Sequence, residues 1–209
     1  MKGEITMDER KIKEIIKTHY GEIFVDYKIP KPYIGKGPIK AILLGNDPGN
    51  NFDGETKRFE YAFALTDDSR YFRIFRENIA ELDGITIDNL YIQNLCKNYF
   101  NCDTSKNASW KEVAKLWMPC LKEEFDSQFS KNVPILASSY VLIEAILEYG
   151  NSQKIKLKPK DFYQNCSIIE RQGNYFDRDI IPFFRHKGYK MVDWQDYKNF
   201  LNEYFKGVS

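Results

Sequence analysis

The chain contains 209 residues, of which 43% are hydrophobic and 29% charged, and its formal net charge is +1 at pH 7. This length and composition are typical of a globular protein with a sizeable core, and they exclude an extended disordered chain. The near-neutral charge also excludes a uniformly basic, histone-like protein. Because no apolar run approaches the roughly 18 residues that span a bilayer, and no apolar signal region opens the chain, we expect a cytoplasmic protein without membrane contact.

The first third of the chain predicts a helix and then a buried strand. A capping box at 6–9 opens a helix with isoleucines on one face, which ends near Gly21. A connection rich in proline and glycine covers 30–38. The apolar run 41–44 predicts a buried strand, and the sharp loop 45–49 follows it.

The middle of the chain predicts two helices around a second strand. Ser69 is the expected cap of a helix whose apolar side chains face inward. Residues 89–95 read as a strand. A second capping box at 109–112 opens a further helix, which Pro119 is expected to kink or divide.

The last third predicts three strands and two helices. Residues 133–137 read as a short strand, and Ser138 or Ser139 then starts a helix that Gly150 closes. Two further apolar segments, 167–169 and 180–184, predict strands, and Asp193 is expected to cap the last helix.

Strands alternate with amphipathic helices along the whole chain, which is typical of an α/β protein. We therefore expect a three-layer α/β/α sandwich with a central, mainly parallel sheet of about four strands. No linker or repeat interrupts the sequence, so residues 1–209 are expected to form one domain. Within it, 1–39 hold the first helix and its connection, 40–190 the motif-bearing core, and 191–209 the last helix.

Charge and cysteine content bear on partners and cofactors. Residues 151–190 contain nine Lys or Arg and four Asp or Glu, a net charge of +5 that leaves −4 on the remainder. This segment offers a local surface for a polyanion, although a solvated face without a partner is the alternative. The four cysteines include no C-x-x-C pair and the chain has two histidines, so we expect reduced thiols and no metal site.

Four side chains of different chemistry follow the predicted strands: Asp47, Phe63, Asn94 and His186. In parallel sheets the ligand lies beyond the carboxyl ends of the strands. An amide can form hydrogen bonds with the edge of a nucleobase, and an aromatic ring can stack on its face. An imidazole can form a hydrogen bond with a carbonyl oxygen, and a carboxylate can orient water or stabilise a positive charge. Each residue alone also has a structural reading as turn, core, backbone partner or exposed side chain, so only their joint placement favours a nucleobase site.

At these positions the sequence resembles the uracil-DNA glycosylase superfamily. Residues 42–49, ILLGNDPG, look like the family's first motif, a buried strand ending in Gly-x-Asp-Pro or Gly-x-Asn-Pro-Gly. Phe63 is similar to the stacking phenylalanine, Asn94 to the strand-end asparagine that reads uracil, and His186 to the histidine of the last motif. Residues 134–137 resemble the next strand before a helix, so the resemblance spans roughly 40 to 190.

The resemblance implies a monofunctional DNA glycosylase of base-excision repair, which hydrolyses the N-glycosidic bond of a flipped-out uracil or related damaged base. Asp47 would stabilise the cationic sugar and orient water, and His186 would donate a hydrogen bond to O2 of the departing base. Asn46, Phe63 and Asn94 would bind the base.

The remaining implied features concern the loop, the DNA and the cofactors. Gly45, Pro48 and Gly49 would shape the loop and supply backbone groups. The implied partner is DNA, single- or double-stranded, bound by a monomer without any cofactor, because the iron–sulfur branches of the family place cysteines before the first motif and this chain has none there. The candidate phosphate contacts are Lys154, Lys156, Lys158, Lys160, Arg185 and Lys187. For the four lysines at 154–160, a solvated strand face or loop is the alternative.

Three other readings stay open. The family's last motif usually continues His-Pro-Ser, whereas here His186 is followed by Lys187 and Gly188. This departure and the near-zero net charge favour a non-catalytic protein that binds a nucleobase or nucleic acid on the same fold. A hydrolase that uses Asp47 and His186 on a nucleoside is another reading, and a structural or interaction protein is the last.

Overall fold

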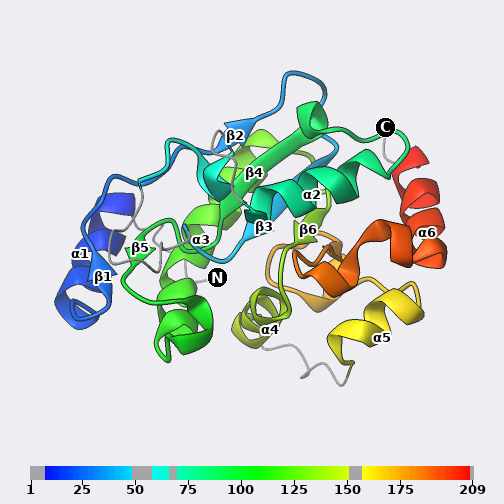
Figure 1. The fold of residues 1–209 in the computed structure, drawn as a ribbon. Helices are drawn as coiled ribbons and strands as arrows, with labels where there is room; N and C mark the ends of the chain where they lie inside the picture. The colour runs from blue at the N-terminus through cyan, green and yellow to red at the C-terminus, as the bar shows by residue number, and fades with distance from the viewer. Residues whose placement is uncertain (1–7, 49–57, 66–69, 151–156, 208–209) are drawn as a thin grey trace.

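The computed structural model describes residues 8–48, 58–65, 70–150 and 157–207. They form a mixed α/β fold with a five-stranded, mostly parallel sheet and a separate two-stranded antiparallel sheet (Figure 1). The α/β class agrees with the prediction, but the sheet has five strands where about four were predicted. No helix within these residues is long and apolar enough to cross a membrane.

The five-stranded sheet brings the carboxyl ends of four strands to one edge. The strand order is β2 (Tyr33–Ile34), β4 (Leu90–Asn94), β3 (Ala41–Gly45), β6 (Ile135–Ala137) and β7 (Ile180–Pro182). Only β2 runs antiparallel to its neighbour. The register sets Gly45 opposite Asn94, and Leu44 opposite Ala137. Residues that follow β3, β4, β6 and β7 are therefore neighbours.

The strand predictions differ from the structure where short strands depend on their partners. The extra strand β2 lies in the connection rich in proline and glycine and is two residues long, too short to give an apolar pattern. The predicted strand over 167–169 is wrong, since only Ile169 pairs there, in an isolated antiparallel bridge to Ile180. The small second sheet pairs β1 (Phe24–Val25) with β5 (Tyr99–Phe100).

Six helices accompany the sheet in the part of the chain that the structure describes. They are α1 (Glu9–His19), α2 (Arg70–Ala80), α3 (Trp110–Gln128), α4 (Tyr140–Tyr149), α5 (Pro159–Gln164) and α6 (Gln195–Lys206). In Figure 1, α1 and the small sheet lie at one end of the molecule and α5 and α6 at the other. Helix α4 contacts β6 and β7, and α3 contacts both α1 and α4.

Helix starts were predicted less well than helix positions. Ser139 caps α4 through a hydrogen bond from the backbone N–H of Leu142, and Gly150 ends this helix, as predicted. The box predicted at 109–112 is wrong, because Ser109 makes no side-chain cap hydrogen bond. Asp193 does not cap α6 either: it ends a 3₁₀ turn, and Trp194 is the cap residue.

Two of the predicted helix caps include residues that the structure does not describe. Helix α1 is capped by Asp8, whose carboxylate accepts a hydrogen bond from the backbone N–H of Arg10. Thr6, the first residue of the predicted box, and Ser69, the predicted cap of α2, lie outside the described residues.

Helix α3 runs through Pro119 as one element of 19 residues, so the predicted division is wrong. A proline inside a helix removes one backbone hydrogen bond and costs roughly 3 kcal/mol. Trp117, Leu121 and Phe125 are fully buried on either side of Pro119. Burying side chains of this size stabilises a fold by about 1.5–3 kcal/mol each, which offsets the loss.

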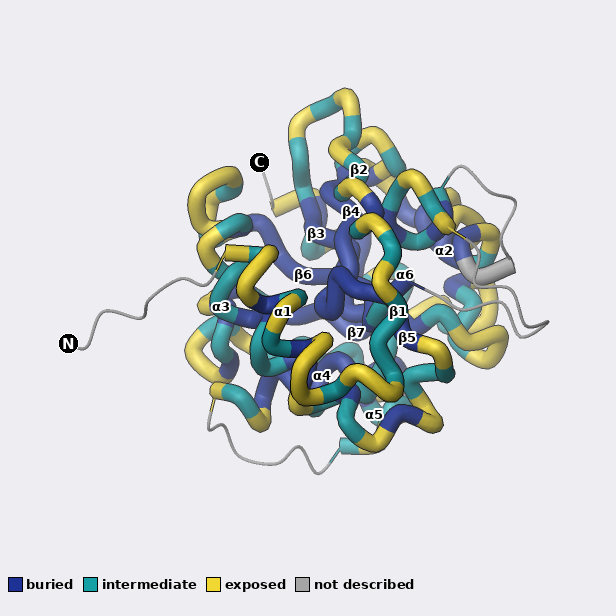
Figure 2. The backbone as a smooth tube through the Cα atoms, turned by 90° about the vertical axis from the view of Figure 1, so that its left-hand side faces the viewer, coloured by how far each residue is buried: buried dark blue, intermediate teal, exposed yellow. Residues whose placement is uncertain are grey.

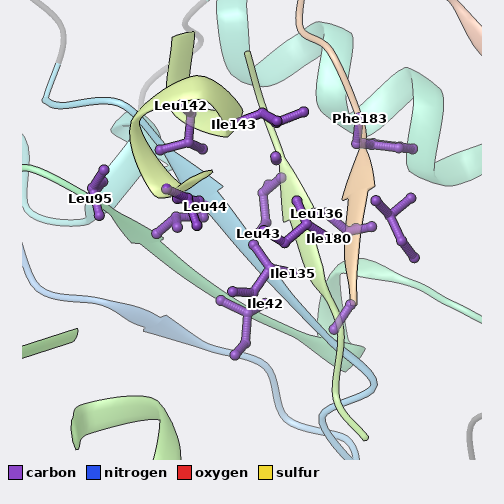
Figure 3. Packing of buried hydrophobic residues seen from close by; sticks show 14 of the residues in the cluster. Ile42, Leu43, Leu44, Leu95, Ile135, Leu136, Leu142, Ile143, Ile180 and Phe183 are labelled. Carbon is purple, nitrogen blue, oxygen red and sulfur yellow. The ribbon is translucent and has the colours of Figure 1, made fainter. Parts of the chain in front are cut away.

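The core is centred on strands that are buried along their whole length. All residues of β3, β4, β6 and β7 are buried, and Figure 2 shows the sheet as a dark centre within exposed helices and loops. Ile42, Ile135 and Ile180 are paired across neighbouring strands, and they belong to one buried cluster with Leu142 and Ile143 of α4 (Figure 3). This packing fixes the strand ends on which the site is built.

A fully buried arginine, Arg178, joins the end of α3 to the start of β7. Its guanidinium group is 3.1 Å from the carboxylate of Asp126. The same group donates to four backbone carbonyls, those of Phe125, Phe129, Ser130 and Val133. Phe129 and Val133 lie beyond the last residue of α3, so Arg178 supplies their carbonyls with a donor that the helix does not provide.

Candidate functional site

The centre of the site is Gly45, the last residue of β3. A Cβ atom at this position would lie 2.5 Å from Oδ1 of Asn94 and 2.5 Å from two ring carbons of Phe63. Only a residue without a side chain permits such close approach. The structure therefore brings two predicted base-binding residues, Phe63 and Asn94, together at the carboxyl end of β3.

Phe63 is held in an unusual backbone conformation. It lies in the 3₁₀ turn Ala62–Ala64 with φ of 63° and ψ of 11°, in the left-handed region that costs other residues about 1–2 kcal/mol relative to glycine. Its ring packs edge-on against Phe75 of α2, with a centroid distance of 5.1 Å and an interplanar angle of 82°. The ring is half-buried, so the fold fixes its position without enclosing it.

Asn94 presents a buried amide that lacks a partner. The side chain is 2% exposed, and its Nδ2 atom has no hydrogen-bond partner among the described residues. An unpaired buried donor costs about 1–3 kcal/mol, and native proteins leave few such groups. The donor is therefore available to an acceptor atom of a ligand that reaches this end of the sheet.

Ser138 supplies a second unpaired polar group at the same edge. It follows β6, its backbone N–H donates to the carbonyl of Leu44 at 3.1 Å, and its buried hydroxyl has no partner among the described residues. The sequence pattern predicts Ser138 only as a possible start of the helix that follows β6. Two unsatisfied side chains thus lie at the carboxyl ends of the strands on either side of β3: Asn94 ends β4 and Ser138 follows β6.

Asp47 is placed in the loop after β3 and is held by two donors. Thr104 Oγ1 donates to Asp47 Oδ2 at 2.5 Å, and Trp110 Nε1 donates to the same oxygen at 2.9 Å. Burial raises the pKa of Asp47 to about 6, against the opposing effects of Thr104, the charge of Arg185 and Trp110. At neutral pH the group is mostly a carboxylate, but one with strong affinity for a proton.

The rest of the loop has a structural task. Asn46 is 4% exposed, and its Oδ1 accepts a hydrogen bond of 2.6 Å from the hydroxyl of Ser139, the cap residue of α4. This bond ties the loop to the start of α4. Asn46 was predicted to bind the base, but its side-chain oxygen already has this partner. Pro48 is buried, and Gly49 lies outside the described residues.

The chain after β7 places the charge of Arg185 within electrostatic reach of Asp47. The backbone N–H of Arg185 donates to the carbonyl of Ser138 at 3.1 Å, and its positive charge lowers the pKa of Asp47. His186 is exposed; its Nδ1 accepts from the backbone N–H of Gly188 at 3.2 Å, and its ring lies edge-on to Tyr189. None of these contacts of His186 involves Asp47, Phe63 or Asn94.

The candidate phosphate contacts are only partly described. Lys158, Lys160 and Lys187 are exposed, while Lys154 and Lys156 lie outside the described residues. The alternative interpretation of these lysines, a solvated strand face or loop, does not hold for Lys160, which lies in α5. Signals for this helix were present: Pro159 occupies its first turn, and the Asp161 carboxylate accepts from the backbone N–H of Lys158 at 2.7 Å.

Neither a group of metal ligands nor a comparison with known proteins adds residues to the candidate site. Within the ranges that the structure describes, no group of three or more His, Cys, Asp or Glu side chains is arranged to hold a metal ion. No protein-family model matches the chain, and a search of curated proteins finds no match. The functional interpretation therefore rests on the geometry around Gly45.

Proposed function

We propose that the protein is a DNA glycosylase that hydrolyses the N-glycosidic bond of a flipped-out uracil or a related damaged base. One observation carries the proposal: the half-buried ring of Phe63 and the buried, unpaired amide of Asn94 meet at Gly45. The proposal includes a three-layer α/β/α arrangement, a single domain and a monomer that acts on DNA in the cytoplasm.

The meeting of ring and amide suits a pyrimidine base. A base inside a duplex must be extruded, which costs a few kcal/mol, and stacking on an aromatic ring returns about 1–3 kcal/mol. The free donor of Asn94 would bind the O4 carbonyl of uracil, and its Oδ1 would accept from N3–H. Cytosine presents the inverse pattern and would leave both groups unpaired, which is a strong basis for rejection.

Asp47 and Arg185 supply the charges that the reaction needs. Cleavage leaves positive charge on the sugar and negative charge on the base. The Asp47 carboxylate would stabilise the sugar and orient water, which adds to C1′ while the base leaves with a proton. Arg185, whose charge acts on Asp47, would oppose the negative charge that develops on the base. The predicted hydrogen bond from His186 to O2 requires its exposed loop to close on the base.

A strand-cleavage assay tests the proposal. Labelled oligonucleotides with one uracil, single-stranded or paired with adenine or guanine, are incubated with the protein and then treated with alkali to cut abasic sites. We expect cleavage by the parent and by Asp196→Asn, a matched change at an exposed carboxylate of α6. Asp47→Asn should be roughly 10²–10⁴-fold slower. Equal rates for the parent and Asp47→Asn, or no abasic product from any substrate, would overturn the proposal.

The exposed position of His186 favours a second candidate, a protein that binds a nucleobase or single strand without cleaving it. Its Nδ1 is engaged within its own loop rather than at the site. This candidate predicts binding of uracil or of uracil-containing DNA that Asn94→Ala weakens, together with no abasic product. Cleavage of free nucleosides without cleavage of DNA would instead indicate a nucleoside hydrolase.

A further inference from the structure

The carboxylate of Asp47 is held at one oxygen only. Thr104 and Trp110 both donate to Oδ2, at 2.5 and 2.9 Å. None of the described residues donates a hydrogen bond to Oδ1. The side chain is half-buried. Among the described residues, two donors anchor Oδ2 and none anchors Oδ1.

The two donors come from one short and firmly anchored segment. Thr104 opens a 3₁₀ turn, and its carbonyl accepts from the backbone N–H of Asn107 at 3.3 Å. The carbonyl of Asn107 accepts in turn from the backbone N–H of Trp110 at 3.1 Å. Trp110 is the first residue of α3 and is 1% exposed. Because its indole cannot move without disturbing the core, the direction of its N–H group is set by the fold.

The surroundings of Asp47 are mixed in charge. Besides the two donors, Arg185 after β7 favours the ionised form, whereas Asp103, next to Thr104, opposes it. The thiols of Cys96 and Cys102 also lie within the electrostatic influence of Asp47, and burial raises the pKa of both. Burial alone would favour a neutral acid, so the hydrogen bonds and the arginine keep the group ionisable near neutral pH.

We propose that Thr104 and Trp110 are positioning residues that fix Oδ2 of Asp47 and so direct Oδ1 toward the reacting sugar and its attacking water. The inference rests on the proposed glycosylase function and adds two residues to it. Hydrogen bonds to an ionised group also favour the ionised form, so the pair both orients the carboxylate and keeps it charged. Because Oδ2 is fixed by two hydrogen bonds, the carboxylate has one preferred orientation, and Oδ1 is preorganised for the reaction.

The kinetic test uses a matched pair of variants at Thr104. Thr104→Val removes the hydroxyl and keeps the shape, while Thr104→Ser retains the donor. We expect Thr104→Val to lower kcat by about tenfold with little change in KM. Its acid limb should move up by about one pH unit, because loss of the donor raises the pKa of Asp47. Thr104→Ser should resemble the parent. A merely structural role would leave the position of the acid limb unchanged.

A second readout needs no activity. The indole N–H signals of the three tryptophans can be followed by NMR during a pH titration. The Trp110 signal should titrate with a midpoint near pH 6 in the parent, at higher pH in Thr104→Val, and not at all in Asp47→Asn. Trp117 serves as the internal control, because its indole donates to the neutral amide of Asn98.

The two proposals fail in different ways. A parent protein that cleaves no substrate contradicts the glycosylase function, whereas the titration still decides whether Trp110 and Thr104 hold Asp47. A Trp110 signal that does not titrate, or a midpoint and acid limb that are the same in Thr104→Val as in the parent, overturns the positioning role.

Discussion

Replacing Asp47 with asparagine should stabilise the protein at neutral pH. Burial raises the pKa of Asp47 from the ordinary value of 3.8 to about 6. Below pH 3.8 the group is protonated in both the folded and unfolded states. Between pH 3.8 and 6 the folded state retains the proton that the unfolded chain has lost, so the free energy of unfolding falls as the pH rises.

The size of the effect follows from the difference in pKa. About two pKa units at about 1.4 kcal/mol each give a cost of about 3 kcal/mol for the ionised carboxylate above pH 6. An asparagine has no charge to desolvate, and its side-chain oxygen can still accept from Thr104 and Trp110. Asp47→Asn should therefore match the parent near pH 4 and exceed its stability by about 3 kcal/mol at pH 7.5.

Urea unfolding of both proteins at a series of pH values measures this difference. Other titrating groups are common to parent and variant, so the difference between their free energies of unfolding isolates Asp47. A difference that stays constant from pH 4 to 7.5, or a variant that loses stability relative to the parent as pH rises, would refute the reasoning. It would mean that Asp47 is not desolvated in the folded protein.

Three further substitutions probe the site and the core. Gly45→Ala should lower the free energy of unfolding by about 1–3 kcal/mol and weaken base binding, because its Cβ would lie 2.5 Å from atoms of Phe63 and Asn94. Urea unfolding measures the first effect, and a uracil titration measures the second. Asn94→Leu should raise stability by about 1–3 kcal/mol by removing a buried unpaired donor, and should abolish uracil recognition; unchanged recognition would contradict the assignment. Arg178→Met should cost about 3–5 kcal/mol in urea unfolding, since it leaves the carbonyls of Phe129 and Val133 without this donor, while kcat of the folded protein stays the same.

The sequence indicated those elements whose own residues carry a strong pattern. The apolar run 41–44 and the periodic helix that includes Leu142 and Ile143 are examples, and both are in the core of the structure. Strand β2 and the bridge at Ile169 were mispredicted because pairing with a distant segment, rather than local preference, decides their conformation. Pro119 does not divide α3 for the same reason, since tertiary packing outweighs the backbone hydrogen bond that the proline removes.

The candidate site shows a similar division. The junction of Gly45 and Asn94 was predictable because residues that end adjacent parallel strands must be neighbours. Thr104 and Trp110 were not, because their contacts with Asp47 join residues 57 and 63 positions apart in the chain. No local signal in the sequence marks such a pair. The same holds for Arg185, which the sequence suggested only as a phosphate contact.

The conformation of Phe63 has a consequence for what can enter the site. Its backbone φ and ψ angles lie in a region that an unfolded chain seldom occupies. Folding has therefore already restricted this residue, and ligand binding loses little further conformational entropy there. A flat ligand could stack on the ring without any rearrangement of the Phe63 side chain, so little of its stacking enthalpy would be lost. A bulky, non-planar ligand would have to turn the ring and break its edge-on contact with Phe75. If the proposed function holds, the site would therefore select flat ligands by their shape, independently of their hydrogen bonds.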